Sequence, residues 1–435
     1  MKIIKFNFIY IFIYLLLISF NTLAGDTTDI TMEADYILSC QFLNNPSSEA
    51  YGAINNVYGE PTWVVPGENA IAIMGLEKAS RILQDDVYLQ RANLTADYLV
   101  RTQDSIDGSW LNKINYNDAS DNDNGKGLRH TAEVMIAFDK LGYNSERYES
   151  MKKASQFILE CQDVLNKQGN DDGLVGGGKD KDGNYHTWRW TSDNSFAYQA
   201  LKASANWAKH YGNNALAAEL ETSSQKILDG IKTHLFNGSD HWHRVIDQNG
   251  DVVTSNDKEG NREDRSDWIR YSPLMLDLPI SQYVDPSLVG DWISNTLQRN
   301  DGSLVWDDTL YSSRQSPGYS FQAMLVWLDL NQSDNVNSAL FWAEHSGLWQ
   351  KTPDNDNGIT GGWLDWIENG TTPPEWQRFI DTSAYYIMTH GTDTVERGYD
   401  FNPEVPEPST IILFFLGIVS LFGFNKKNLL TRSTK

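Results

Sequence analysis

The hydrophobic positions of residues 25–400 recur every three to four residues, which is the spacing of amphipathic helices. The helical segments fall into two classes that alternate strictly along the chain. Segments of the first class have one apolar stripe and a charged face, and they span residues 30–43, 87–103, 147–162, 216–236, 287–299 and 335–350. Segments of the second class carry less charge and more Ala, Ser and aromatic residues, and they span residues 66–80, 128–142, 191–204, 265–278, 316–330 and 380–391. The pattern therefore predicts six pairs of helices.

The two classes differ in where their helices can be buried. A helix with a single apolar stripe belongs on the outside of a bundle, whereas a weakly polar helix can be buried on all sides. Six such pairs predict an all-α fold, an (α/α)6 toroid of six helical hairpins whose second-class helices line the axis. An open solenoid would have the same periodicity. We expect a closed ring, because neither terminal pair has the polar outer face that caps a solenoid.

Similar turns follow several of the outer segments. They contain Asp107-Gly108, Asp172-Gly173, Asp301-Gly302 and Asn357-Gly358. Glycine after Asp or Asn supplies the positive φ that ends a helix and reverses the chain. These turns therefore predict the ends of one repeated unit.

Two families of helical toroids resemble this pattern. The stretch ADYLVRTQDSIDGSW, residues 96–110, resembles the QW repeat of the squalene-cyclase and prenyltransferase toroids, with Gln103 followed by a Gly-x-Trp that ends at Trp110. The acidic DxDD-type motif of the cyclases is not evident, and neither is a zinc-binding set, because Cys40 and Cys161 belong to outer segments. The six-pair layout of the whole domain also resembles the six-hairpin glycosidase superfamily, which implies carbohydrate chemistry.

The two ends of the chain have the patterns of export signals. Residues 1–24 combine Lys2 and Lys5 with an apolar run and small residues before Gly25, which predicts a cleaved signal peptide. Residues 401–410 form a linker with the sequence Val405-Pro406-Glu407-Pro408, residues 411–424 are a hydrophobic helix, and residues 425–435 are a basic cytoplasmic tail.

This tail resembles the PEP-CTERM sorting signal. The resemblance implies a Gram-negative envelope protein that is processed by an exosortase-type enzyme and then released or held at the surface, often with exopolysaccharide. The C-terminal helix would contact the inner membrane before processing. A plain C-terminal anchor is the alternative.

The charge of the chain excludes one class of partner. The formal net charge is −23, and such a surface repels nucleic acid and other polyanions at long range. The two cysteines occupy equivalent places in separate repeats, so we expect both to be unpaired packing thiols.

Ionisable residues recur at one position of the inner segments. Alignment of their apolar residues places six residues in one register: Glu68, His130, Asp193, Asp267, Gly318 and Asp381. In a toroid the starts of the inner helices converge on one opening, so we expect these side chains to share a cavity. Helix capping by Asp, Ser and Thr is the alternative explanation.

Aromatic residues precede several of these positions. A carbohydrate cleft needs aromatic faces for the CH groups of the sugar and polar groups for its hydroxyls. The predicted substrate-binding residues are Trp63, Trp188, Trp190, Trp306, Tyr319, Arg265 and Asp267.

The predicted substrate is an extracellular polysaccharide or oligosaccharide, and the predicted activity is glycoside hydrolysis by paired carboxyl groups. The catalytic candidates are Glu68 as the acid, Asp193 or Asp381 as the base, and His130. One alternative is a polysaccharide lyase that uses His130 with Tyr319 and with Arg265 or Arg270. A sugar epimerase or isomerase that uses His130 and His186 is another, and a non-catalytic glycan-binding or matrix protein is a third.

We expect no cofactor. Oxygen-rich stretches at residues 120–127, 176–184 and 353–362 make Ca²⁺ the alternative, although none has the spacing of an EF-hand loop.

Overall fold

The computed structural model describes residues 27–56, 63–117, 120, 122–167, 172–253, 267–305, 314–351, 360–364, 367–368 and 378–390. All of them belong to the first of two compact units, Met1–Asp400 and Phe401–Lys435. The predicted signal peptide, the linker, the hydrophobic helix and the basic tail lie outside the described residues. Among the residues that are described, no helix has the length and apolarity that a membrane span requires.

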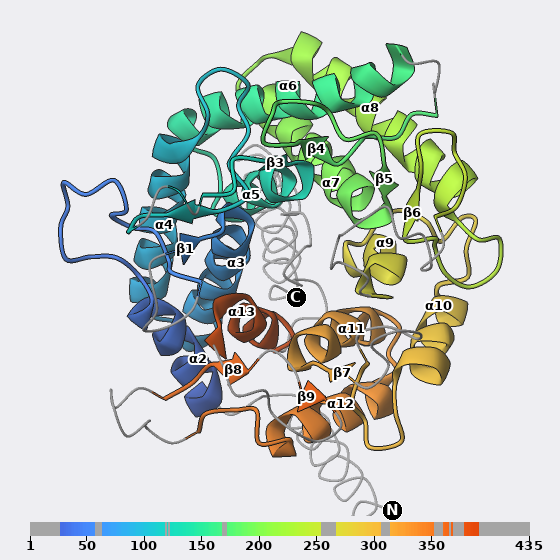
Figure 1. Ribbon diagram of the computed structural model, residues 1–435. Coiled ribbons are helices and arrows are strands. Elements are labelled where there is room, and N and C mark those ends of the chain that lie inside the picture. The colour runs from blue at the N-terminus through green and yellow to red at the C-terminus, as the bar shows by residue number, and fades with distance from the viewer. Residues whose placement is uncertain are drawn as a thin grey trace, which may run out of the picture. The chain divides into compact units, whose positions relative to one another are not determined.

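The helices alternate between an inner and an outer layer (Figure 1). The inner layer consists of α3 (Pro66–Leu83), α5 (Leu128–Lys140), α7 (Thr191–His210), α9 (Ser272–Met275) with the preceding 3₁₀ helix η3 (Asp267–Tyr271), α11 (Pro317–Asp329) and α13 (Ile380–Met388). The outer layer consists of α2 (Thr27–Ser39), α4 (Asp86–Thr102), α6 (Ser145–Lys167), α8 (Asn214–Gly230) with η2 (Ile231–Leu235), α10 (Pro286–Trp292) with η4 (Ile293–Leu297), and α12 (Ser333–His345). The expected alternation of two helix classes is confirmed.

The inner helices form a closed ring. Each packs against the next, and α13 packs against both α11 and α3, so the last inner helix meets the first. Gly75 of α3 makes this contact close, because a Cβ on it would lie 2.7 Å from the Cβ of Ala384 in α13. The expectation of a ring rather than an open solenoid is therefore confirmed.

A buried carboxyl group joins the first outer helix to the last hairpin. Glu33 of α2 is fully buried and accepts hydrogen bonds from Trp349 Nε1 at 2.6 Å and from the backbone N–H of Gly362 at 3.1 Å. Trp349 stacks on Trp363 with ring centroids 4.6 Å apart. Burial raises the pKa of Glu33 to about 7, although its hydrogen bonds offset part of this effect.

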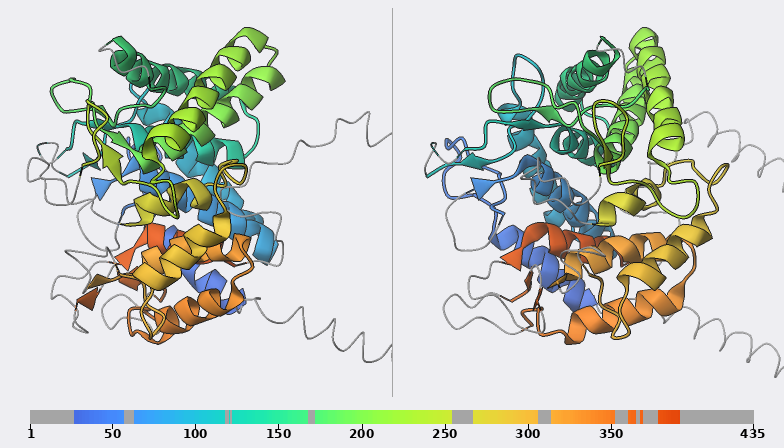
Figure 2. Two further views of the ribbon diagram at one scale, coloured as in Figure 1. Left: turned by 90° about the vertical axis from the view of Figure 1, so that its right-hand side faces the viewer. Right: turned by 45° about the vertical axis from the view of Figure 1, so that its right-hand side comes forward.

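Short strands lie on one side of the ring (Figure 2). They form five antiparallel pairs: β1 (Trp63–Val64) with β2 (Ile114–Asn115), β3 (Lys126–Gly127) with β4 (Gly178–Lys179), β5 (Arg189–Trp190) with β6 (Val245–Ile246), β7 (Arg314–Gln315) with β9 (Ile367–Glu368), and β10 (Arg378–Phe379) with β8 (Trp363–Leu364). One strand of each pair shortly precedes an inner helix, so the pairs surround the face on which the inner helices begin. The purely helical pattern of the sequence did not predict these strands.

The fourth hairpin is shorter than its sequence pattern suggested. Where the structure describes the inner segment predicted at residues 265–278, from residue 267 on, its helices are η3 and the four-residue α9, and Asp277 then takes a positive φ of 51°. Proline at position 273 follows the 3₁₀ turn and has no N–H to continue its hydrogen bonding, which separates the two short helices.

The repeated turns have a common construction. Gln103 donates to the carbonyl of Gly108 in the turn at 2.8 Å and to the carbonyl of Ser150 on the next outer helix at 2.9 Å. Gln162 contacts Gly173 and Ser223 in the same way. Gly108 has φ +77°, and a Cβ on it would lie 2.4 Å from the Lys153 carbonyl, so only glycine fits. The turns therefore fix each hairpin to the next outer helix.

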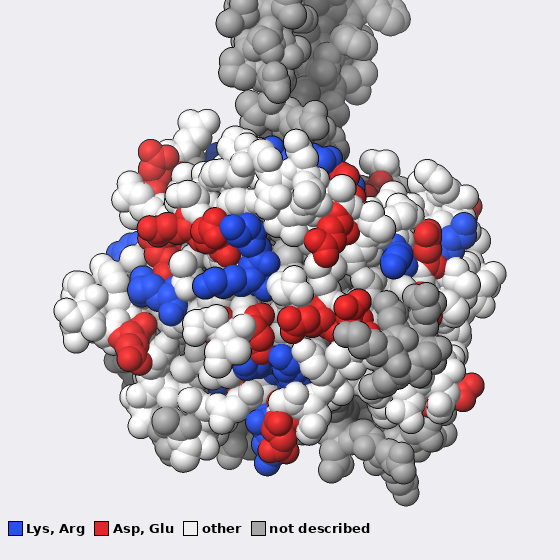
Figure 3. Space-filling view, turned by 90° about the horizontal axis from the view of Figure 1, so that it is seen from above, with Lys and Arg blue, Asp and Glu red and all other residues white. Residues whose placement is uncertain are grey.

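Positive and negative residues are not segregated on one face of the molecule. On the side that Figure 3 shows, acidic and basic side chains are interspersed. The two cysteines are buried and do not form a disulfide, as expected.

Candidate functional site

The candidate site lies at the face of the ring on which the inner helices begin. We call this region the mouth, defined by the first turns of α3, α5, α7, α11 and α13 together with η3. The short strand pairs hold the approaches to these helices. The mouth thus collects side chains from hairpins that are far apart in the sequence.

The first two turns of α5 contribute three charged or ionisable groups. Glu133 is 1% exposed, and its Oε1 lies 3.1 Å from Arg129 Nε. Its Oε2 lies 3.3 Å from His130 Nδ1, and the His130 side chain is 18% exposed. Because these residues are three and four positions apart, they share one face of the helix. A buried carboxylate therefore orients an imidazole that reaches solvent.

Helix α3 packs directly on this pair. A Cβ on Gly67 would lie 2.1 Å from Glu133 Oε2 and 2.2 Å from His130 Nδ1, so only glycine leaves room for the two side chains. Glu68 is the next residue of α3 and is partly buried. The chain thus brings Glu68 and His130 to the same part of the mouth.

Asp381, in the first turn of α13, belongs to the same electrostatic environment. Burial raises the pKa of Asp381, whereas a hydrogen bond from the Thr382 backbone, 2.8 Å from Oδ1, and the charge of Arg129 lower it. The negative charge of Glu133 raises the pKa of Asp381. Burial is the largest of these effects, so the carboxyl group keeps its proton to a higher pH than an ordinary aspartate.

Arg129 connects this group to the fourth hairpin. Its Cζ lies 5.3 Å from the ring centroid of Trp268 in η3, which is cation–π geometry. We call Arg129, His130, Glu133, Trp268 and Asp381 the Arg129 cluster. The cluster draws on three separate hairpins, and it contains a cation, a carboxylate, an imidazole and a carboxyl group of raised pKa.

Asp193 lies in a neighbouring group at the start of α7. A Cβ on Gly177 would lie 3.4 Å from Asp193 Oδ2, 3.6 Å from His186 Cβ and 3.8 Å from Trp190 Cδ1. Trp188 and Trp190 have ring centroids 6.4 Å apart. The loop around this one glycine therefore brings together the predicted base Asp193, two predicted substrate-binding tryptophans and His186.

The remaining predicted residues have other surroundings. Asp267 is fully buried and accepts from Arg244 Nε at 2.9 Å and from Arg270 Nη1 at 3.3 Å. Trp63 is partly buried, with Lys113 Nζ 5.6 Å from its ring centroid. Tyr319 is partly buried in the first turn of α11. Trp306 and Arg265 lie outside the described residues.

The oxygen-rich stretches that made Ca²⁺ the alternative are described only in part. Among the residues described, no group of three or more His, Cys, Asp or Glu side chains could hold a metal ion. In the loop of residues 176–184, Asp180 Oδ1 accepts from the backbone N–H groups of Asp182 and Asn184, at 2.9 Å each. Most of the stretch at residues 353–362 lies outside the described residues.

Sequence reasoning missed Arg129, Glu133 and Trp268. The signal was present as Arg-His-x-x-Glu at the start of an inner segment, where the i,i+4 pair Arg129–Glu133 is unusual on a helix of low charge.

Comparison with solved structures supports the architecture. No protein-family model matches the sequence, and no curated protein matches it. The structure is similar to that of a D-mannose isomerase, with a TM-score of 0.60 and 13% identity over 83% of this chain and 96% of that one. It is also similar to cellobiose 2-epimerase from Bacillus thermoamylovorans B4167, with a TM-score of 0.58 and 12% identity over 83% of this chain and 98% of that one.

A third similar structure is an α-amylase from Clostridium perfringens, with a TM-score of 0.55 and 10% identity over 84% of this chain and 98% of that one. At these identities the likeness concerns the fold and not the reaction. The chain therefore has the (α/α)6 toroid fold that these structures share.

Proposed function

We propose that the protein is a carbohydrate-active enzyme whose acid–base chemistry takes place at the mouth. The observation that carries this proposal is the Arg129 cluster, in which Glu133 orients His130 next to Arg129 and a carboxyl group of raised pKa. Groups with unlike proton affinities in one partly buried site are typical of general acid–base catalysis. The similar structures include a sugar isomerase, sugar epimerases and glycosidases, which supports the substrate class.

The geometry best fits a sugar isomerase or epimerase. Glu133 engages Nδ1 of His130, so Nε2 is the nitrogen that would take a proton from the carbon next to the sugar carbonyl. The electron pair moves onto the carbonyl oxygen and gives an enediolate, whose negative charge Arg129 can stabilise. Asp381 supplies a proton to that oxygen and gives an enediol. Return of the proton from His130 to a carbon of the enediol, with transfer of one enediol hydroxyl proton back to the Asp381 carboxylate, re-forms a carbonyl and completes isomerisation or epimerisation.

Glycoside hydrolysis is the second candidate, and the raised pKa of Asp381 favours it. A glycosidase needs a protonated carboxyl group beside the leaving oxygen and a second, ionised carboxylate. Asp381 fits the first role and Glu68 or Asp193 the second. The sequence-based hypothesis gave the acid role to Glu68 and considered Asp381 as the base, so the two proposals differ in which group holds the proton.

A polysaccharide lyase and a non-catalytic glycan-binding protein have less support. A lyase needs a cation to neutralise an acidic sugar; of the two arginines considered for that role, Arg270 contacts Asp267 and the ring of Trp292, and Arg265 lies outside the described residues. A glycan-binding protein would have the same mouth without turnover. We also propose export and exosortase-type processing, which mass spectrometry of both termini of the mature protein tests.

One experiment separates isomerisation or epimerisation from hydrolysis. Neutral mono- and oligosaccharides are incubated with the protein in D₂O, and both deuterium at C1 or C2 and new reducing ends are measured. An isomerase or epimerase incorporates deuterium, and His130→Gln abolishes this. A hydrolase releases reducing ends, and Asp381→Asn abolishes that release.

The matched control is His345→Gln, because His345 lies on the outer helix α12 and its ring stacks on Phe341. It should leave either activity unchanged. Full activity in both His130→Gln and Asp381→Asn would contradict a reaction at this site.

A further inference from the structure

We propose that Asp107, which lies outside the mouth, is a positioning residue that sets the places of His130 and Asp193. The inference rests on the proposed function, since it concerns the same candidate catalytic groups. Asp107 belongs to the turn after α4, which the sequence marked as a repeated Asp-Gly. Its carboxylate bonds to both strands of the β3–β4 pair, and these strands adjoin the two groups.

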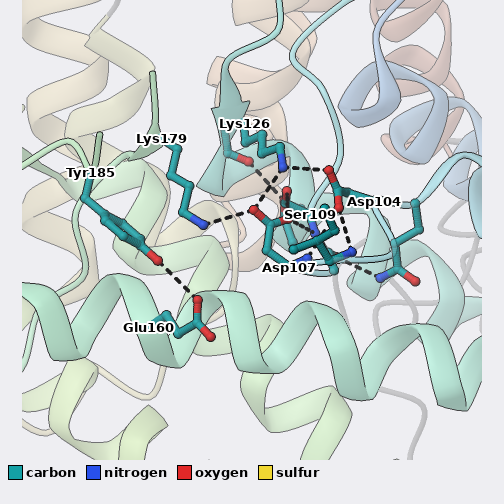
Figure 4. Close-up of polar contacts among 12 residues, drawn as sticks. Asp104, Asp107, Ser109, Lys126, Glu160, Lys179 and Tyr185 are labelled. Carbon is teal, nitrogen blue, oxygen red and sulfur yellow. Dashed lines mark hydrogen bonds and ion pairs between the residues drawn. The ribbon is translucent and has the colours of Figure 1, made fainter. Parts of the chain in front are cut away.

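The contacts form one connected network (Figure 4). Asp107 Oδ2 accepts from Lys126 Nζ of β3 and from Lys179 Nζ of β4, at 2.9 Å each. Asp107 Oδ1 is fixed by the hydroxyl of Ser109 at 2.6 Å. Lys126 also donates to Asp104 at 2.6 Å. Although partial burial opposes it, the hydrogen bonds from Ser109, Lys126 and Lys179 hold the pKa of Asp107 well below its usual range.

The network offsets the electrostatic repulsion between two lysines of the strand pair. Lys126 stands directly opposite Lys179, and like charges in that position destabilise a pair of strands. Asp107 bridges both lysines and Asp104 supplies a second negative charge beside Lys126, so Asp107 holds the strands at a fixed separation. Tyr185 lies beside Lys179, with Nζ 4.8 Å from its ring centroid, and its hydroxyl donates to Glu160 at 3.1 Å.

The β3–β4 strand pair lies next to both candidate groups, His130 and Asp193. A Cβ on Gly127, the second residue of β3, would lie 3.0 Å from His130 Cδ2. On the other side, Gly177, the residue before β4, borders Asp193, and the Gly177 carbonyl accepts from the backbone N–H of Leu128 at 3.3 Å. A change in the separation of β3 and β4 therefore moves His130 relative to Asp193.

The equivalent turns of other repeats support the inference independently. Asp172 bonds to Arg189 Nε at 2.7 Å, and Arg189 stands four residues before Asp193, as Lys126 stands four residues before His130. Asp301 contacts only uncharged partners among the described residues, namely Ser303 and, at 3.5 Å, Gln315.

The inner helix after Gln315 has Gly318 at the register position of His130 and Asp193. Charged contacts between a turn and a strand, here called charged clamps, thus precede α5 and α7, two of the inner helices that carry candidate catalytic groups. The uncharged clamp precedes an inner helix that has no ionisable group at that position.

The test compares Asp107→Asn with Asp301→Asn, the same change in an equivalent turn. We expect Asp107→Asn to lower kcat about 10- to 100-fold with KM little changed, because small displacements of catalytic groups are costly. Asp107→Glu should recover part of the loss. Asp301→Asn should leave kcat unchanged, even if it lowers the melting temperature as much as Asp107→Asn does. If Asp107→Asn does not fold, Lys179→Met removes one bond of the clamp and leaves the Lys126–Asp104 pair.

A second readout does not need turnover. The ring resonances of His130, assigned by comparison with His130→Gln, should shift in the NMR spectrum of Asp107→Asn and not in that of Asp301→Asn. Equal kcat in the two Asn variants, or unshifted His130 resonances in Asp107→Asn, would overturn the inference. A wild-type protein that converts no sugar would instead contradict the proposed function, and the NMR comparison would still decide the role of Asp107.

Discussion

Glycines at the starts of inner helices decide how closely neighbouring side chains can approach. Pro66-Gly67 and Pro317-Gly318 begin α3 and α11 in the same way, but a Cβ on Gly67 would collide with Glu133 and His130, whereas one on Gly318 would lie 3.1 Å from Thr382 Oγ1. We expect Gly67→Ala to lower kcat/KM at least about 10-fold by displacing the His130–Glu133 pair.

Gly318→Ala is the matched control and should have a small effect. Alanine is the better helix former by about 1 kcal/mol, so neither change needs to unfold the helix. Equal activity of the two variants, measured beside their melting temperatures, would count against the role of the pair.

The carboxyl group of Asp381 predicts a pH dependence. Burial raises its pKa, so the proton donor persists above the ordinary range of aspartate and is lost as pH rises through the raised value. Activity should therefore fall on the alkaline side, and Asp381→Asn should abolish most activity at low pH. A profile of kcat/KM against pH checks this, and a wild-type alkaline limb that persists unchanged in Asp381→Asn would assign the limb to another group.

The sequence predicted part of the candidate site, because of the geometry of a closed ring. Helix starts in a closed ring converge, so a shared register was enough to group Glu68, His130 and Asp381. The register could not predict that the buried carboxylate of Asp267 would pair with Arg244 and Arg270, because those contacts depend on the course of a loop. Trp268 was missed because its contact with Arg129 joins hairpins that are not neighbours in the ring.

At the scale of elements, the contact between α3 and α13 closes the ring. Gly75→Ala would place a Cβ 2.7 Å from the Cβ of Ala384, and overpacking of this kind costs about 1–3 kcal/mol. We expect urea unfolding to show that loss, and Gly75→Ala with Ala384→Gly to recover part of it. An unchanged free energy of unfolding in Gly75→Ala would mean that the two helices can move apart freely.

The elements that the sequence did not predict are the short strands, which leave too short a pattern in the sequence. The strands have two residues each, which is too short for the alternation of apolar and polar positions that marks a strand. Their pairing depends on the turns and the ring. The long helices α3, α5 and α7, in contrast, were predicted because their burial pattern extends over several turns.

At the scale of the whole ring, Glu33 makes stability depend on pH. The pKa of Glu33 rises from 4.5 to about 7 on folding, so the folded state binds its proton more tightly. This stabilisation is complete below about pH 4.5 and is lost as pH rises through about 7. The difference corresponds to about 3 kcal/mol at most.

The measurement is the free energy of unfolding in urea at pH 5 and pH 8. Wild type should be less stable at pH 8 by up to that amount, whereas Glu33→Gln should show a smaller difference. Glu149→Gln is the control, because the Glu149 side chain is 63% exposed. A pH difference of the same size in Glu33→Gln would assign the effect to other groups.

Ring closure by α13 also affects how the protein must be made. The flank of α3 that α13 covers emerges from the ribosome roughly 300 residues before its partner, which at 5–20 residues per second is about 15 to 60 s of synthesis. During that time the nascent chain presents an apolar helix surface with nothing to cover it. Production of the protein should therefore depend on chaperones that hold unfinished chains, and ribosome-bound intermediates that stop before residue 380 should be sensitive to proteases.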